Sequence, residues 1–163
     1  MSVNPAVVDP TDEDQRLCQQ LLDLLDGRAN QLLQQARQLV DDYWIAHTEQ
    51  GALQQRKNKG YTVPRCRLVK HTLVIEWFNQ RTVPAINPKT NRPYVFSNYL
   101  PKGREYHYPE AVFQSVARDW ELPLIQQYEH LFADLRRRAQ VLAQLRLQVR
   151  RRLPKPVPER DDA

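Results

Sequence analysis

The sequence predicts an α+β fold in which two long heptad-type helices flank a three-stranded antiparallel β-meander and a short helix. Apolar residues follow a four–three spacing towards both ends of the chain, alternate with polar residues in its middle, and are separated by turn-forming residues. At 163 residues the chain suits a single domain. We expect this domain to span residues 11–152, with a flexible tail over 1–10 and a disordered, proline-rich tail over 153–163.

The first long helix is predicted over residues 12–47. Thr11 or Asp12 can cap it, and acidic residues follow in the first turn, where the helix dipole favours them. The apolar residues then recur in steps of four and three, which indicates a heptad seam, at Cys18, Leu22, Leu25, Ala29, Leu32, Ala36, Leu39 and Tyr43. Gly27 interrupts this helix at a cost of about 1 kcal/mol relative to alanine.

The β-meander is predicted over residues 61–101. "RCRLVK" and "HTLVIEWFNQ" form a hairpin that places Leu73, Ile75 and Trp77 on one face. "NPKTNRP" is a turn, because it combines Asn and Pro and contains no apolar residue outside Pro. "YVFSNYL" is the third strand. We expect Val95, Phe96 and Leu100 to pack in the core, and residues 102–108 to form an exposed rim.

Two further helices are predicted over residues 109–152. Pro109 suits the first position of a short helix. The second long helix should span 122–152, and its seam comprises Ile125, Tyr128, Phe132, Leu135, Ala139, Leu142 and Val149, with Arg146 as a mismatch. The two long helices could pair antiparallel within one chain or between the chains of a homodimer, and the sequence leaves both arrangements open.

Charge is distributed unevenly along the chain. Residues 1–50 contain 3 Lys or Arg and 9 Asp or Glu, residues 51–110 contain 11 and 3, and residues 111–163 contain 10 and 7. The basic middle indicates a phosphate-bearing or acidic partner. The two cysteines, Cys18 and Cys66, suit reduced thiols in a cytoplasmic protein. We expect no signal peptide, because the acidic N-terminus contains no apolar stretch. We also expect no membrane contact, because no apolar run is long enough to span a bilayer.

The sequence contains no recognisable catalytic constellation. Its four histidines are widely separated, its four glycines do not cluster, and no Gly-x-Ser-x-Gly motif occurs. We therefore expect neither an enzyme nor a metal or cofactor. A weaker alternative is strand transfer by Tyr106 or Tyr108, which lie near Arg104 and His107.

Basic and aromatic residues are the remaining candidates for function. Cations can bind a phosphate backbone, and aromatic rings can stack on unpaired bases. The DNA-binding candidates are Arg56, Lys57, Lys59, Arg65, Arg67, Lys70, Lys89, Arg92, Lys102, Arg104, Tyr99, Tyr106 and His107. A solvated basic surface without a ligand explains the same residues about as well. The partner-binding candidates are Leu25, Leu32, Leu39, Arg136, Arg137 and Arg138, although these arginines could instead face the acidic first helix.

Residues 64–147 resemble the MobI family of auxiliary proteins from conjugative plasmids and integrative conjugative elements. The resemblance rests on Glu76–Trp77, the "SNYLPKG" turn, Tyr108–Pro109 and the "WEL" step into a long basic helix. It implies a non-enzymatic accessory factor for mobilisation that assists a separate relaxase at the origin of transfer, with DNA and transfer proteins as partners. The alternative is a coiled-coil adaptor that recruits a protein partner without contacting DNA.

Overall fold

The computed structural model describes residues 10–153, except for the side chains of residues 10, 11 and 82–84. The tails expected over 1–10 and 153–163 therefore lie outside the described residues, apart from Pro10 and Leu153. The elements confirm the α+β class, and in chain order they are α1 (Pro10–Ala52), the 3-10 turn η1 (Arg56–Asn58), β1 (Thr62–Val69), β2 (Thr72–Asn87), β3 (Arg92–Tyr99), α2 (Glu110–Gln114) and α3 (Glu121–Arg152).

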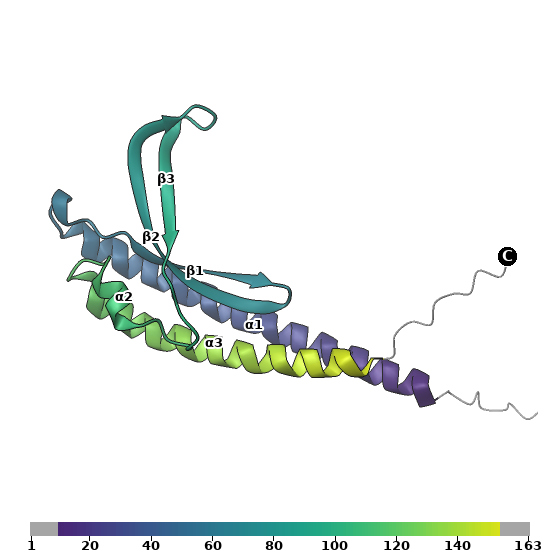
Figure 1. The fold of residues 1–163 in the computed structure, drawn as a ribbon. Helices are drawn as coiled ribbons and strands as arrows, with labels where there is room; N and C mark the ends of the chain where they lie inside the picture. Colours follow the sequence, from purple (N-terminus) through teal and green to yellow (C-terminus); the bar gives the residue numbers. More distant parts are fainter. Residues whose placement is uncertain (1–9, 154–163) are drawn as a thin grey trace, which may run out of the picture.

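The two long helices lie antiparallel against each other within the chain, so that the start of α1 lies beside the end of α3 (Figure 1). Arg146, the mismatch in the predicted seam of α3, forms an ion pair with Asp26 of α1. The Arg146 side chain therefore links the two helices through an ion pair, which explains why the apolar pattern is interrupted at this position. Both helices are longer than predicted, and α1 gains residues at each end.

The buried stripe of α1 is wider than a heptad seam. Five predicted seam residues are buried, namely Leu22, Ala29, Leu32, Ala36 and Tyr43. Leu33 is buried as well, outside the predicted seam. The stripe widens because α1 packs against β1 and β2 as well as against α3. A helix with two neighbours needs a broader apolar face than one helix of a two-stranded coil.

The antiparallel sheet has the order β1-β2-β3, but its outer strands pair with different halves of β2. β1 pairs with residues 72–79 and β3 with residues 78–87. The first half of this ribbon lies along the helices, whereas the second half rises away from them (Figure 1). We call this second half, residues 80–97, the arm.

Trp77 is the centre of the core and is fully buried. Its ring makes edge contacts with Tyr43 of α1 at 5.1 Å, Phe113 of α2 at 5.4 Å and Phe132 of α3 at 5.7 Å, measured between ring centroids. Aromatic pairs in this geometry contribute about 0.5–1.5 kcal/mol each beyond their buried area. One strand residue therefore joins all three helices to the sheet.

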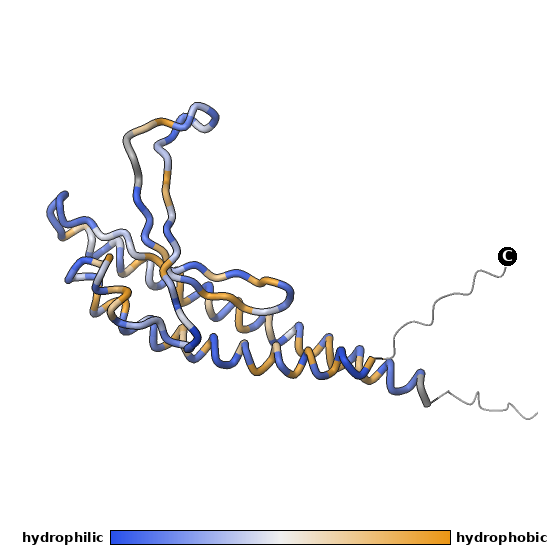
Figure 2. The backbone as a smooth tube through the Cα atoms, viewed as in Figure 1, coloured by the Kyte–Doolittle hydropathy of each residue, from blue (hydrophilic) through white to orange (hydrophobic). Residues whose placement is uncertain are grey.

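The arm has no helical layer beneath it, which corrects the expectation for β3. Val95 and Phe96 are 53% and 56% exposed, whereas Leu100, just beyond the strand, is buried as expected. Along β3, a hydrophobic stretch lies between hydrophilic ones although the strand is exposed (Figure 2). Among the described residues, the core cluster includes none between Phe78 and Leu100.

Candidate nucleic-acid interface

The arm is basic and lacks acidic residues. It contains Arg81, Lys89 and Arg92 and no Asp or Glu, and all three cationic side chains are exposed. Its tip is the predicted "NPKTNRP" turn, where the Asn87 side chain accepts a hydrogen bond from the Lys89 backbone N–H at 2.9 Å. The backbone N–H of Asn91 donates to the Asn87 carbonyl at 2.9 Å. The turn therefore holds two cations at the point of the arm farthest from the helices.

One face of the arm combines cations with exposed aromatic rings. The strand register pairs Arg81 with Phe96, and alternation places Tyr94 and Arg92 on the same face. The Tyr94 and Phe96 rings lie 6.4 Å apart, and they are 38% and 56% exposed. Arg81 and the two rings were not among the predicted interface residues. Counting every second residue from Trp77 puts Arg81 on the same strand face as Trp77. This alternation does not predict that Arg81 is exposed to solvent.

A second cationic group lies where the ribbon bends. Arg65 and Arg67 are exposed on β1, and their guanidinium nitrogens lie 3.8 Å and 3.3 Å from Oε2 of Glu76 on β2. The Arg65 guanidinium also stacks on the Tyr99 ring at 5.4 Å and donates a hydrogen bond to the Tyr99 hydroxyl. Among the described residues, no carboxylate of α1 pairs with Arg65 or Arg67, but the Glu76 carboxylate within the sheet offsets part of their charge.

The predicted DNA-binding residues do not converge into one patch. Lys70 lies at the β1–β2 turn and Lys89 at the β2–β3 turn, at opposite ends of the 16 residues of β2. That strand spans roughly 50 Å along its path, because a strand rises about 3.3 Å per residue. Arg56 and Lys57 lie in η1, beyond the end of α1. The basic middle of the chain therefore forms several separate groups.

The loop after β3 lies against the helical layer and contributes less exposed surface than predicted. The Lys102 ammonium donates to the backbone carbonyl of Glu105, and desolvation, followed by the nearby Arg136 charge, lowers the pKa of Lys102. The His107 ring lies 6.2 Å from that of His130 on α3. Arg104 and His107 remain exposed, whereas Tyr106 is half-buried.

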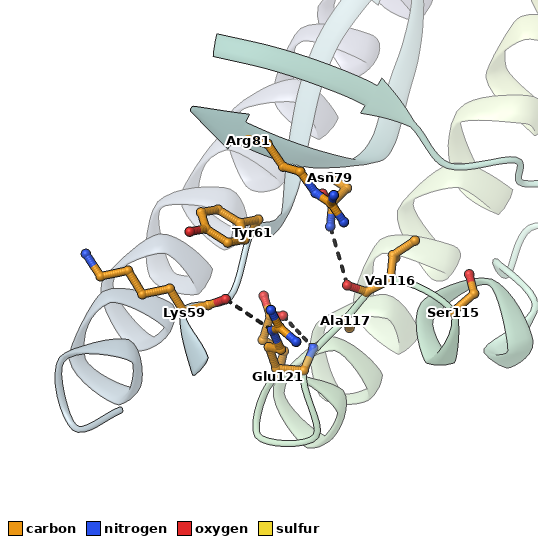
Figure 3. Close-up of a pocket in the computed structure, with 9 residues that line it drawn as sticks. Lys59, Tyr61, Asn79, Arg81, Ser115, Val116, Ala117 and Glu121 are labelled. Atoms are coloured by element: carbon orange, nitrogen blue, oxygen red, sulfur yellow. Dashed lines mark hydrogen bonds between the residues drawn. The ribbon is translucent and has the colours of Figure 1, made fainter. Parts of the chain in front are cut away.

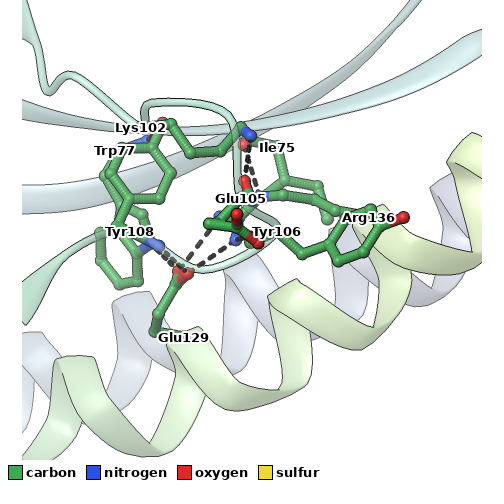
Figure 4. Close-up of polar contacts among 8 residues, drawn as sticks. All are labelled: Ile75, Trp77, Lys102, Glu105, Tyr106, Tyr108, Glu129 and Arg136. Atoms are coloured by element: carbon green, nitrogen blue, oxygen red, sulfur yellow. Dashed lines mark hydrogen bonds and ion pairs between the residues drawn. The ribbon is translucent and has the colours of Figure 1, made fainter.

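Arg136 and Tyr108 belong to a buried polar cluster (Figure 4). Glu129 accepts two hydrogen bonds from the Arg136 guanidinium, at 2.7 and 3.1 Å, and one from the Trp77 indole N–H at 2.6 Å. Arg136 also donates to the backbone carbonyls of Ile75 and Tyr106 at 3.0 and 2.8 Å. The Tyr108 hydroxyl accepts from the Trp77 backbone N–H at 3.2 Å. These groups are committed to holding α3 against the sheet, which leaves neither Arg136 nor Tyr108 available to a ligand.

The other predicted partner-binding residues also make contacts inside the chain. Leu32 is 1% exposed and Leu39 packs against the core cluster, while Leu25 is half-buried. Arg137 and Arg138 form ion pairs with Asp134 of their own helix, at 2.8 and 3.5 Å, rather than with the acidic residues of α1.

The fold and this surface define a class of α+β protein in which a basic β-ribbon projects from a two-helix base. Within residues 10–153, no helix is long and apolar enough to cross a membrane. The model of a protein family described as MobI protein matches residues 32–150. Because the match covers well over half of the chain, the chain belongs to the MobI family and is a mobilisation-related protein. Comparisons with curated proteins and with solved structures give no match.

Proposed function

We propose that this protein is a non-catalytic, DNA-binding accessory factor for conjugative transfer, and that its arm is the main DNA-contacting element. In this proposal the protein binds duplex DNA at the origin of transfer and assists a separate relaxase there. Membership of the MobI family supports a role in conjugative transfer. The single observation that carries the DNA contact is the arm itself, an exposed ribbon with three cations and no acid.

Physical dimensions favour a groove of duplex DNA as the binding site for the arm. The major groove is about 12 Å wide and admits a two-stranded ribbon. Lys89 and Arg92 at the tip would contact phosphates, whose charge provides affinity that does not depend on sequence. Tyr94 and Phe96 would contact base edges or methyl groups, since both rings are exposed on one face. Burying these rings against DNA would remove apolar surface that the free protein leaves in water.

The test is binding to origin-of-transfer duplex measured by fluorescence anisotropy at increasing salt. The wild-type affinity should fall steeply with salt, and Lys89→Gln with Arg92→Gln should reduce the slope of log K against log salt by about two, because each phosphate contact contributes roughly 0.9. A matched control is Arg16→Gln with Arg28→Gln, which removes the same charge from exposed positions on α1. No binding at about 50 mM salt would contradict the proposal, because phosphate contacts are strongest at low salt.

Assistance to the relaxase is tested separately, by transfer frequency in cells that lack the gene. Wild-type protein and the α1 control should restore transfer, whereas the tip variant should not. Restoration by the tip variant, combined with normal relaxase nicking without this protein, would contradict the accessory role at the DNA.

A protein adaptor without DNA contact is the second candidate function. It is favoured by exposed apolar residues on the long helices: Leu17 and Leu24 of α1 are 54% and 70% exposed, and Val141 of α3 is 50% exposed. If this candidate is right, Leu24→Glu with Val141→Glu abolishes transfer, while the arm-tip variant transfers normally.

A further inference from the structure

A polar cavity of about 370 Å³ opens at the base of the arm (Figure 3). It lies between the segment that follows η1, the middle of β2 and the connection from α2 to α3. Six of its lining residues carry side-chain hydrogen-bond donors, and they are Lys59, Tyr61, Asn79, Arg81, Ser115 and Arg118. No element supplies more than two of them, so the folded chain assembles the cavity from distant parts of the sequence.

Two arginines place positive charge at this cavity. Nε of Arg81 donates to the Asn79 side chain at 3.1 Å, and Nε of Arg118 donates to the Lys59 carbonyl at 3.4 Å. Within the described residues, the terminal guanidinium nitrogens of both arginines have no hydrogen-bond partner. The Lys59 side chain extends along the rim, and its ammonium points away from the cavity (Figure 3). Two oriented guanidinium groups are therefore available to an anion.

Glu121 also lines the cavity, but its carboxylate already has several partners. One oxygen accepts from the Thr62 backbone N–H at 3.0 Å and contacts the His47 ring nitrogen at 2.8 Å. The other oxygen accepts from the Arg118 backbone N–H at 2.7 Å. The carboxylate is fully buried. The Glu121 carboxylate therefore holds the surrounding segments together through hydrogen bonds and is not available to bind a cation in the cavity.

We propose that this cavity binds a phosphate group, and that the DNA backbone supplies it. Guanidinium groups match phosphate oxygens in a forked geometry. The Tyr61 hydroxyl and the second amide hydrogen of Asn79 can complete the coordination, whereas the Ser115 hydroxyl already donates to the Val112 carbonyl at 2.7 Å. Arg81 lies on the same strand face as Phe96 and Tyr94. A DNA strand that follows this face of the arm therefore reaches the cavity at its base. The DNA source rests on the proposed function, whereas the phosphate site itself does not.

Inorganic phosphate is the first probe, followed through backbone amide NMR shifts of Tyr61 and residues 115–117 against a chloride titration of equal ionic strength. We expect saturable shifts confined to this region. Arg118→Gln should weaken phosphate binding by about tenfold or more, the loss of one charge-assisted hydrogen bond. Arg137→Gln, which removes an exposed guanidinium of α3 far from the cavity lining, should bind phosphate as the wild type does. The proposed site would be wrong if chloride caused the same amide shifts as phosphate. It would also be wrong if phosphate caused the same shifts in Arg118→Gln as in the wild type.

The second probe is a short DNA duplex added to the same samples. Perturbation of the same amides, with displacement of phosphate, supports the DNA backbone as the source. If duplex binds without disturbing these amides, the cavity takes free phosphate and the DNA source is wrong. If the arm binds duplex but phosphate never binds, the proposed function survives and this inference fails. Circular dichroism of Arg118→Gln checks that the variant is folded.

Discussion

At the scale of single residues, buried carboxylates decide what several conspicuous side chains do. Glu129 accepts hydrogen bonds from Trp77, Tyr108 and Arg136, so a mid-helix arginine that looks like a binding residue is part of the core. Sequence alone could not show this, because Arg136 stands in a run of three arginines with the same local pattern. Only the packing of α3 against β2 separates the buried member from its two neighbours.

The first prediction concerns this ion pair. Arg136→Met should lower the free energy of unfolding by about 3–5 kcal/mol, because it leaves Glu129 buried without its charged partner. Arg137→Met is the control, since that side chain is 62% exposed and should change stability by no more than about 0.5 kcal/mol. Urea unfolding of the two variants measures the difference. Equal, small losses would show that the pair does not hold α3 to the sheet.

The second prediction contrasts two glycines. A Cβ at Gly60 would overlap the Glu121 carboxyl group and lie 2.7 Å from the Trp120 ring, whereas a Cβ at Gly27 would meet nothing within 4 Å. Gly60→Ala should therefore destabilise the protein, and Gly27→Ala should stabilise it by up to about 1 kcal/mol through helix propensity. Thermal unfolding decides between them. A stable Gly60→Ala variant would contradict the close approach of residue 60 to α3.

The third prediction concerns alkaline pH. Burial, and then the charge of Glu121, raise the pKa of Tyr43 far above its ordinary value of about 10. The folded state therefore favours the neutral phenol, so this contribution to stability is complete below about pH 10 and is lost as the pH rises further. Tyr43→Phe should lose less stability than wild type between pH 9 and 11, although Tyr108, whose pKa is also raised, keeps part of the dependence. Parallel pH profiles from urea titrations would refute this assignment.

At the scale of elements, periodicity predicted the helices well and the arm poorly. A three–four spacing over some 30 residues specifies a helix, and the ends of α3 fall within one residue of the prediction. Alternation specifies a strand but not its environment, so β3 was expected to pack although it is exposed along its whole length. The cause is the offset pairing in which β1 and β3 take different halves of β2, and no local sequence signal encodes it.

The fourth prediction is that the arm can be removed without unfolding the protein. Replacing residues 82–95 by Asn-Gly would join Arg81 to Phe96, which face each other in the register, through a two-residue turn. The melting temperature should fall by no more than about 5 °C, since the deleted residues whose side chains are described, 85–95, lie outside the core cluster. Circular dichroism and a melting curve provide the measurement, and loss of cooperative unfolding would mean that the arm supports the core.

At the scale of the whole molecule, the basic residues form several separate groups rather than one continuous patch. The sequence located the basic third correctly, but the fold separates its cations among the arm, the bend of the ribbon and the loops at either end. Arg81 and Arg118, which were not predicted as site residues, come together at the base of the arm although 37 positions separate them in the chain. Convergence over such a separation depends on the packing of the α2–α3 connection against β2, where the Asn79 side chain donates to the Val116 carbonyl at 3.5 Å, and composition cannot reveal this contact.

The arm as the DNA-contacting element is the central claim, and the most direct measurement compares wild type with the arm-trimmed protein on the same duplex. At about 50 mM salt the trimmed protein, shown to be folded, should bind at least about tenfold more weakly, because it loses two exposed tip cations and the Tyr94 ring. Equal affinity of the two proteins would contradict the account and move the interface elsewhere on the chain.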